Sequence, residues 1–294
     1  MKSPNLNSCL GVASTVLQHT STRLPLEGKL ALITGASRGI GAAIARNLAS
    51  KGSSIALNFT SDSSAAHCEA LRKELESQYP VKCLSVKADI GTPFGPASLV
   101  EAIKSHFNHT SSQPFQIDIV INNAGVASNA TIEEFKVEEF ERMYRINVLG
   151  PLLLMQAVLP YLLPDRSGRI VNLSSISSTE GFTGQSVYGG TKAALEAMTR
   201  TWARELAERC TVNAINPGPV KTDMWDRMPP EHRGGLRPWT SHSPLAAVRE
   251  GVDEEDLVRD ASFVAGIVAM LCSEDSGWCT GQVVCANGGM RMAI

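Results

Sequence analysis

The chain has 294 residues, of which 43% are hydrophobic and 19% are charged, and this composition excludes an intrinsically disordered protein. Lysine and arginine together number 27 and aspartate and glutamate 29, which gives a net charge of -2. This balance excludes a strongly basic surface for nucleic acids or anionic membranes, and the 5% of aromatic residues are too few to stack single-stranded bases.

The cysteine pattern suggests a reducing compartment. The seven cysteines are scattered and form no C-x-x-C pair, so we expect neither a disulfide framework nor a metal site, and we expect a cytoplasmic protein. No apolar stretch reaches the roughly 18 residues of a membrane-spanning helix.

Residues 1–26 contain no acidic residue and are rich in serine and threonine. We interpret them as a disordered N-terminal extension, with an organelle-targeting segment as the alternative.

From residue 27 onward, short apolar runs alternate with longer helical patterns. The short runs predict strands at 29–34, 54–59, 83–87, 117–122, 168–173, 210–216 and 281–285. The longer segments predict helices at about 40–51, 63–79, 97–109, 132–162, 187–209 and 252–272.

These strands are continuous runs of valine, isoleucine and leucine, which is typical of parallel strands covered on both faces. We therefore predict an α/β fold, namely a single Rossmann-type, doubly wound parallel sheet of about seven strands with helices on both faces. No linker or internal repeat divides residues 27–294, so we expect one domain.

A glycine-rich turn follows the first predicted strand. Gly35 and Gly39 lie between Thr34 and the first predicted helix, and Gly41 lies at the start of that helix; the three glycines do not have the G-x-G-x-x-G spacing. Glycines let the backbone approach a pyrophosphate, and the free N–H groups of the next helix point at its charge. The turn predicts a dinucleotide site, with a plain β–α turn as the alternative.

Further motifs follow in chain order: Asn122-Asn123-Ala124-Gly125, Asn147, Ser174-Ser175, Tyr188-x-x-x-Lys192 and Asn216-Pro217-Gly218. With the turn T-G-A-S-R-G-I-G at 34–41, this series resembles the classical subfamily of the short-chain dehydrogenase/reductase family over about 25–289. Within that family, the chain is similar in style to β-ketoacyl-carrier-protein reductases and fungal polyketide ketoreductases of secondary metabolism. The resemblance implies a nicotinamide-dependent oxidoreductase.

Four residues are predicted to be catalytic. Tyr188 and Lys192 are four apart on one predicted helix and share a face, so we expect the ammonium to lower the pKa of the phenol and make it a proton donor. Ser175 follows the fifth predicted strand, where its hydroxyl can hydrogen-bond the substrate oxygen. By resemblance, Asn147 holds a water that links Lys192 to solvent, and Lys192 binds the nicotinamide ribose. Taken singly, each residue also fits a structural role.

The predicted cofactor is NADP(H). The second predicted strand ends in Asn58-Phe59-Thr60-Ser61, without the carboxylate that binds the ribose 2′-hydroxyl of NAD, whereas Arg38 can pair with a 2′-phosphate. Gly189 and Gly190 weaken a helix, which predicts close approach of the cofactor, with tight helix packing as the alternative. The turn and the resemblance together predict cofactor contacts at Gly35, Ser37, Arg38, Gly39, Ile40, Gly41, Asn58, Thr60, Ser61, Asp89, Ile90, Asn123, Ala124, Gly125, Tyr188, Lys192, Pro217, Gly218, Val220 and Thr222.

The substrate is expected beyond the carboxyl ends of the strands. Residues 219–256 form a long segment rich in methionine and tryptophan, which predicts an irregular lid over an apolar substrate; a subunit contact or a plain surface loop is the alternative. This segment is longer and more charged than in the family, which leaves open whether the substrate is carrier-bound. The predicted substrate pocket consists of Ser175, Phe182, Gln185, Tyr188, Met224, Trp225 and Met228.

The sequence therefore predicts NADPH-dependent reduction of an apolar small-molecule ketone, polyketide-derived or β-ketoacyl, to a secondary alcohol. Two alternatives stay open: oxidation of a secondary alcohol with NAD(P)+, and a nucleotide-sensing protein without catalysis. The resemblance also implies a homotetramer or homodimer, and we expect no nucleic acid or membrane as partner.

Overall fold

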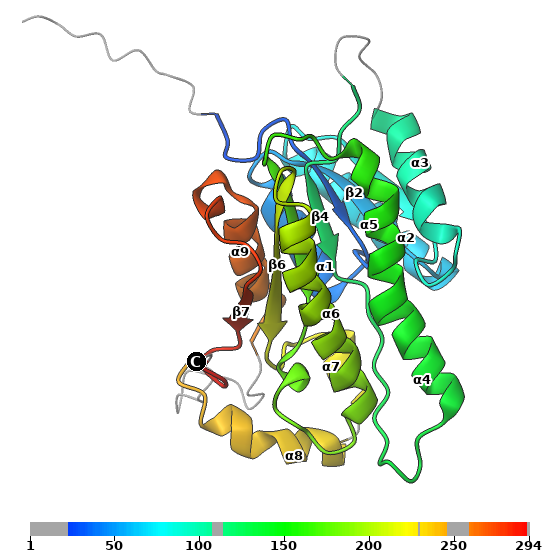
Figure 1. Cartoon of the computed structure of the whole chain (residues 1–294), viewed down its shortest axis with the longest axis vertical. Coiled ribbons are helices and arrows are strands. Elements are labelled where there is room, and N and C mark those ends of the chain that lie inside the picture. The colour runs from blue at the N-terminus through cyan, green and yellow to red at the C-terminus, as the bar shows by residue number, and fades with distance from the viewer. Residues whose placement is uncertain (1–22, 108–113, 229, 246–258, 293–294) are drawn as a thin grey trace, which may run out of the picture.

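The computed structural model of the chain describes residues 23–107, 114–228, 230–245 and 259–292. Its centre is one sheet in the order β3-β2-β1-β4-β5-β6-β7, in which all neighbouring strands are parallel (Figure 1). The strands are β1 (Leu30–Ile33), β2 (Ser54–Phe59), β3 (Cys83–Lys87), β4 (Ile119–Asn122), β5 (Gly168–Leu173), β6 (Cys210–Pro217) and β7 (Val283–Ala286). The predicted Rossmann-type sheet is confirmed, because the strand order reverses beside β1, between β2 and β4.

Helices cover both faces of the sheet. One face carries α1, α2 and α9, and the other carries α3, α5 and α6. The α-helices of the described residues are α1 (Gly39–Ala49), α2 (Asp62–Gln78), α3 (Gly95–Phe107), α4 (Val137–Tyr144), α5 (Gly150–Val158), α6 (Ser186–Glu205), α7 (Asp223–Asp226), α8 (Pro230–Ser241) and α9 (Ala261–Cys272). Shorter turns are a π-helix at Arg145–Leu149 and 3₁₀-helices at Leu159–Tyr161, Ile176–Ser178 and Glu274–Ser276.

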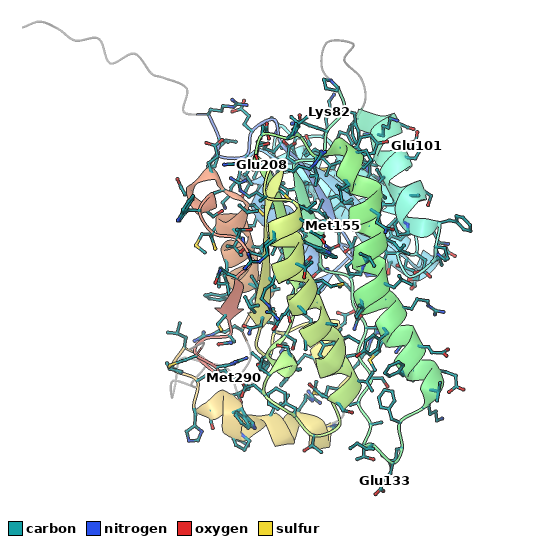
Figure 2. All side chains as sticks on the ribbon, in the orientation of Figure 1. Lys82, Glu101, Glu133, Met155, Glu208 and Met290 are labelled. Carbon is teal, nitrogen blue, oxygen red and sulfur yellow. The ribbon has the colours of Figure 1, made fainter. Side chains whose placement is uncertain are left out.

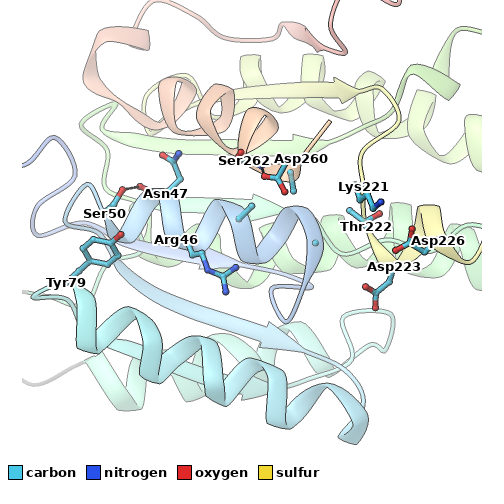
Figure 3. A pocket seen from close by; sticks show the side chains of 13 residues that line it. Arg46, Asn47, Ser50, Tyr79, Lys221, Thr222, Asp223, Asp226, Asp260 and Ser262 are labelled. Atoms are coloured by element: carbon cyan, nitrogen blue, oxygen red, sulfur yellow. Dashed lines mark hydrogen bonds between the residues drawn. The ribbon is translucent and has the colours of Figure 1, made fainter. Parts of the chain in front are cut away.

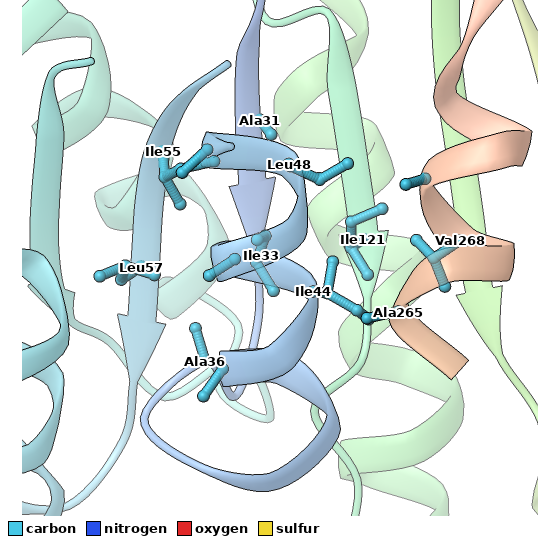
Figure 4. Close-up of a cluster of buried hydrophobic side chains, with 14 of the residues drawn as sticks. Ala31, Ile33, Ala36, Ile44, Leu48, Ile55, Leu57, Ile121, Ala265 and Val268 are labelled. Atoms are coloured by element: carbon cyan, nitrogen blue, oxygen red, sulfur yellow. The ribbon is translucent and has the colours of Figure 1, made fainter. Parts of the chain in front are cut away.

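The side chains of β1 explain the two helical layers. Ala31 and Ile33 belong to the core that packs on α1, α2 and α9, whereas Leu30 and Leu32 belong to the core under α3, α5 and α6. On the first face, Ile44 of α1 lies among side chains from β1, β2, β4 and α9 (Figure 4). Burying one such leucine or isoleucine contributes about 1.5–3 kcal/mol. A strand covered on both sides must therefore be apolar throughout, as its sequence is.

The strands at 54–59, 83–87 and 168–173 have their predicted bounds. The helix predicted at 132–162 is wrong at its start, since α4 begins at Val137. The preceding residues form a turn in which Glu134 N donates to Thr131 O at 3.2 Å. Glu133 lies at the tip of this turn, pointing away from the rest of the molecule (Figure 2). The same stretch is then broken into α4, the π-helix and α5.

The predicted domain boundaries need two corrections. Leu26 is buried in the core and donates its N–H to Lys51 O at 2.9 Å, so the folded part begins before residue 27. The lid at 219–256 is not irregular throughout, because α7 and α8 form within it. Residues 1–22 and 246–258, which hold most of the predicted extension and the later part of the lid, lie outside the described residues.

No helix in the described part of the chain is long and apolar enough to cross a membrane. Within the same residues, the cysteines are free thiols, and no three histidine, cysteine or acidic side chains are grouped to hold a metal ion. Burial raises the pKa of Cys68 to about 11, so this thiol stays protonated at neutral pH.

We predict that Leu48→Ala lowers the free energy of unfolding by about 2–5 kcal/mol, because it empties a fully buried position on α1. Ile132→Ala, at a side chain that is 87% exposed, should change it by less than about 0.5 kcal/mol. Urea unfolding followed by circular dichroism measures both values. Equal losses would contradict this description of the core.

Candidate active site

A cavity of about 690 Å³ lies at the carboxyl ends of β4, β5 and β6. All residues of the predicted substrate pocket line it, namely Ser175, Phe182, Gln185, Tyr188, Met224, Trp225 and Met228. The predicted cofactor residues that line it are Arg38, Ile40, Gly125, Tyr188, Pro217, Gly218, Val220 and Thr222. The two predicted sites therefore form one continuous cleft.

The glycine turn borders this cleft between β1 and α1. Gly35 and Gly39 have φ values of 62° and 54°, a conformation that other residues rarely adopt. A Cβ on Gly41 would lie 2.5 Å from Gly35 O, so the first turn of α1 must be bare there. Ser37 lies in the same turn, and Ile40 lines the cleft. The first N–H groups of a helix have no intrahelical acceptors, so this end of α1 can bind a phosphate.

Thr34 ties the end of β4 to the end of β1. Its Oγ1 accepts hydrogen bonds from the N–H groups of Asn123 and Ala124, both at 3.0 Å. Asn123 Nδ2 donates to Thr34 O at 2.8 Å. Asn123 and Ala124 therefore join the two strand ends, while Gly125 lines the cleft without a side chain that would fill it.

Asn147 lies in the π-helix, a turn often found at functional sites. Its buried Oδ1 accepts a hydrogen bond from Val126 N, and its Nδ2 donates to Val126 O, both at 2.9 Å. Nδ2 also donates to Thr191 Oγ1 at 3.1 Å. The amide therefore joins the loop after β4 to α6, one residue before Lys192.

Ser175, Tyr188 and Lys192 come together between the end of β5 and the start of α6. Ser175 and Tyr188 both line the cleft, where the Ser175 hydroxyl lies close enough to the phenol to affect its pKa. Lys192 is buried, with Nζ donating to Leu173 O at 2.7 Å and lying 5.7 Å from the centre of the Tyr188 ring. Ser175 Oγ also accepts a hydrogen bond from Ser177 N at 3.1 Å, which holds the serine as the cap of a 3₁₀-helix.

Burial shifts two of these side chains toward their neutral forms. Burial raises the pKa of Tyr188, and the nearby Ser175 hydroxyl offsets only part of that rise. Burial also lowers the pKa of Lys192 to about 8, against the opposing effect of Glu196. The prediction that Lys192 lowers the pKa of Tyr188 is therefore wrong for the protein without bound cofactor or substrate. Burial is the larger effect, and Lys192 donates to a backbone carbonyl.

The glycine pair of α6 serves packing, which corrects the predicted contact with the cofactor. A Cβ on Gly189 would overlap with Ser177 O, and one on Gly190 would lie 3.1 Å from the Tyr144 hydroxyl. The bare backbone lets α6 contact the 3₁₀-helix that follows Ser175.

The residues predicted to contact the adenosine differ in exposure. Asn58 is fully buried and its Nδ2 donates to a backbone carbonyl at 2.9 Å, which corrects the expectation that its amide is a free donor. Thr60 and Ser61 are exposed after β2. Asp89 is exposed after β3, and Ile90 beside it is buried.

Arg38 reaches from the phosphate turn to the lid. Its Nη1 lies 3.2 Å from Asp223 Oδ2 at the start of α7. The two side chains are 41% and 51% exposed, and ion pairs this exposed are weak, so an anion can replace Asp223. A Cβ on Gly39 would lie 3.2 Å from Thr222 Cγ2, so the first residues of the lid pack on the turn.

The lid supplies an apolar wall. Trp225 is buried, and Phe182 packs edge-on against Trp239 with ring centres 5.6 Å apart. Asn129 and Leu236, which belong to the loop after β4 and to the predicted lid, also line the cleft. Arg142 is a lining residue that the sequence does not predict, because only the packing of α4 brings it to the cleft.

A second cavity, of about 580 Å³, lies beside α1, between the end of α2 and the start of α9 (Figure 3). It shares Thr222 and Asp223 with the first cavity but contains none of Ser175, Tyr188 and Lys192. The candidate active site is therefore the first cavity.

The chain is similar to known proteins over most of its length. The family model described as Enoyl-(Acyl carrier protein) reductase matches residues 35–291. L-xylo-3-hexulose reductase of Hypocrea jecorina (strain QM6a) is 50% identical, over 92% of this chain and 99% of its own. L-xylulose reductase of Aspergillus niger is 50% identical, over 90% of this chain and 98% of its own. A blue fluorescent protein from a metagenomic library, solved with NADPH, has a TM-score of 0.79 at 31% identity, over 91% of this chain and 100% of that chain.

The chain belongs to the short-chain dehydrogenase/reductase family and is an oxidoreductase, as its motifs predicted. Members of this family bind a nicotinamide cofactor. The bare turn at Gly35 and Gly41, the open end of α1 and the cleft wall at Gly125 fit such a dinucleotide.

We predict that Gly41→Ala weakens binding of the nicotinamide cofactor at least about tenfold, or about 1.4 kcal/mol, because the new Cβ displaces the turn at Gly35 O. Gly266→Ala is the matched control, since its Cβ would enter open space on α9. Fluorescence titration with NADPH and NADH measures both affinities. Unchanged binding by Gly41→Ala would show that the turn does not hold the cofactor.

Proposed function

We propose that the protein reduces a ketone to a secondary alcohol with NADPH, and that Tyr188 donates the proton to the substrate oxygen. Bound NADPH supplies the hydride. The observation that carries the proposal is that Ser175 and Tyr188 line a cleft that extends to Arg38 of the phosphate turn, with the Lys192 ammonium buried beside the Tyr188 ring.

The surroundings of each side chain suit this chemistry. Burial keeps Tyr188 protonated, so it has a proton to give at neutral pH. Lys192, with a pKa of about 8, is mostly charged at pH 7 and stabilises the negative charge that develops on the phenol oxygen. The Ser175 hydroxyl donates a hydrogen bond to the substrate oxygen and holds it near Tyr188. Asn147 stabilises the wall of the cleft, because its amide joins the loop after β4 to α6.

The charges near the adenosine end support NADP(H) over NAD(H). Residues 54–61, which form β2 and the two positions after it, contain no carboxylate that could bind the ribose 2′-hydroxyl of NAD. The first carboxylate after them, Asp62, is paired with Lys87 Nζ at 2.6 Å. Arg38 is partly exposed, and its guanidinium could exchange its carboxylate partner for a 2′-phosphate, an anion whose shape suits a guanidinium.

For the substrate we propose a neutral polyhydroxy ketone, the class named in the two curated relatives. Arg142 lines the cleft, and its Nε and Nη2 donate to the two carboxylate oxygens of Glu139 at 3.1 and 2.7 Å. The pair has no net charge, so this wall offers polar groups to hydroxyls rather than a cation to a carboxylate. Asn129 and Gln185 add amides to the same cleft.

The apolar ketone predicted from the sequence is the second candidate, because Phe182, Met224 and Met228 also line the cleft. L-xylulose and 1-hydroxy-2-pentanone are ketones of equal length that differ in three hydroxyls. Initial rates of NADPH oxidation distinguish the two classes. A higher kcat/KM for L-xylulose supports the polyhydroxy class, and the reverse supports the apolar class.

Tyr188→Phe should lower kcat by about 100- to 10,000-fold, since it removes the proton donor, while NADPH binding stays within about threefold. Tyr79→Phe, outside the cleft, is the matched control and should leave kcat unchanged. Turnover at the wild-type rate in Tyr188→Phe would contradict the assignment.

The wild-type protein tests the two alternative functions. NADPH binding without turnover would support the sensing alternative, and alcohol oxidation that is faster than ketone reduction at physiological cofactor ratios would support the oxidative alternative.

Arg38→Gln should raise the KM for NADPH at least about tenfold and leave the KM for NADH within about twofold, because a charge-assisted hydrogen bond contributes about 1.5–3 kcal/mol. Arg46→Gln, on α1 but outside the cleft, is the matched control. Steady-state rates with both cofactors give the two ratios. An Arg38 variant with an unchanged preference would remove the main support for NADP(H).

We also propose a cytoplasmic homotetramer or homodimer. Its support is a set of exposed apolar side chains on and after α9, namely Phe263, Met270 and Trp278, which a second copy would bury. The free thiols support a reducing compartment.

A further inference from the structure

Glu196 is a buried carboxylate next to the candidate active site. It lies one helical turn after Lys192 on α6 and is only 7% exposed. Its Oε1 accepts hydrogen bonds from Ser174 Oγ and Ser178 Oγ, each at 2.6 Å. A carboxylate is costly to bury unless it is hydrogen-bonded, so the two hydroxyls are what allow Glu196 to occupy this position.

The two serines lie on either side of Ser175. Ser174 directly follows β5, and Ser178 ends the 3₁₀-helix that Ser175 caps. Ser178 Oγ also lies 2.8 Å from Ser175 O. Glu196 therefore fastens both flanks of Ser175 to α6, the helix that carries the proposed proton donor.

Glu196 also acts on Lys192 through its charge. The carboxylate raises the pKa of Lys192, against the burial that lowers it to about 8. Among the described residues, the Lys192 ammonium also contacts two uncharged groups: it donates to the Leu173 carbonyl and lies over the Tyr188 ring.

We propose that Glu196 is a positioning residue, which holds Ser175 through Ser174 and Ser178 and places a negative charge one turn from Lys192. The inference rests on the proposed function. Glu196 does not line the cleft, so it acts only through these neighbours.

Glu196→Gln keeps an acceptor for both serines and removes the charge. The pKa of Lys192 then falls, and because its protonated form is the active one, the alkaline limb of kcat against pH should move to lower pH by about half a unit or more. Glu196→Ala also removes the acceptor, and kcat should fall roughly tenfold or more through misplacement of Ser175, with the KM for NADPH within about twofold.

Glu205→Gln, an exposed glutamate on the same helix, is the matched control and should change neither quantity. The probes are NADPH with L-xylulose or 1-hydroxy-2-pentanone, and circular dichroism checks that each variant is folded. An unshifted alkaline limb in Glu196→Gln, or a wild-type kcat in Glu196→Ala, overturns this inference alone. A wild-type protein that reduces neither ketone overturns the proposed function and this inference together.

Discussion

The hydrogen bonds of Thr34 are the contact on which the site depends. Its side chain is fully buried where β1 and β4 end, and Oγ1 accepts the N–H groups of Asn123 and Ala124 while donating to Ile121 O at 3.2 Å. Without it, the half-buried N–H of Ala124 would lose its acceptor, at about 1–3 kcal/mol, whereas the N–H of Asn123 would keep Ile121 O at 3.0 Å. The phosphate turn begins at the end of β1, and the loop toward Asn147 begins at the end of β4. These hydrogen bonds therefore hold the cofactor end and the substrate end of the cleft at a fixed distance from each other.

Burial around α6 gives the site its acid–base character. It keeps the Tyr188 phenol protonated and brings the Lys192 ammonium close to losing its proton, while the hydrogen-bonded carboxylate of Glu196 acts in the opposite direction. These groups can lie together because Gly189 removes a side chain between α6 and the turn after Ser175. The glycines of α6 therefore let the candidate catalytic residues pack together, rather than leaving room for a ligand.

The fold could be predicted because a strand buried on both sides has a local signature, and the turn motifs mark where strands end. The roles of single polar residues could not. Asn58 is predicted to contact the cofactor, yet its amide is bonded inside the protein. The helix α8 is not predicted, because Gly234, Gly235 and Pro238 disfavour a helix in that segment. Arg142 reaches the cleft through the packing of α4, about which its neighbours in the chain carry no information.

The sequence by itself determined the parallel sheet, the dinucleotide turn and the family, because each follows from hydrophobic pattern or from motifs of residues close together in the chain. It also placed Tyr188 and Lys192 on one face of a helix, whereas Ser175 joined them only through the resemblance to the family. The tertiary structure decided the direction of the pKa shifts, the shape and polarity of the cleft, and the partners of Glu196. Those properties depend on burial and on contacts between elements far apart in the chain, which no local pattern records.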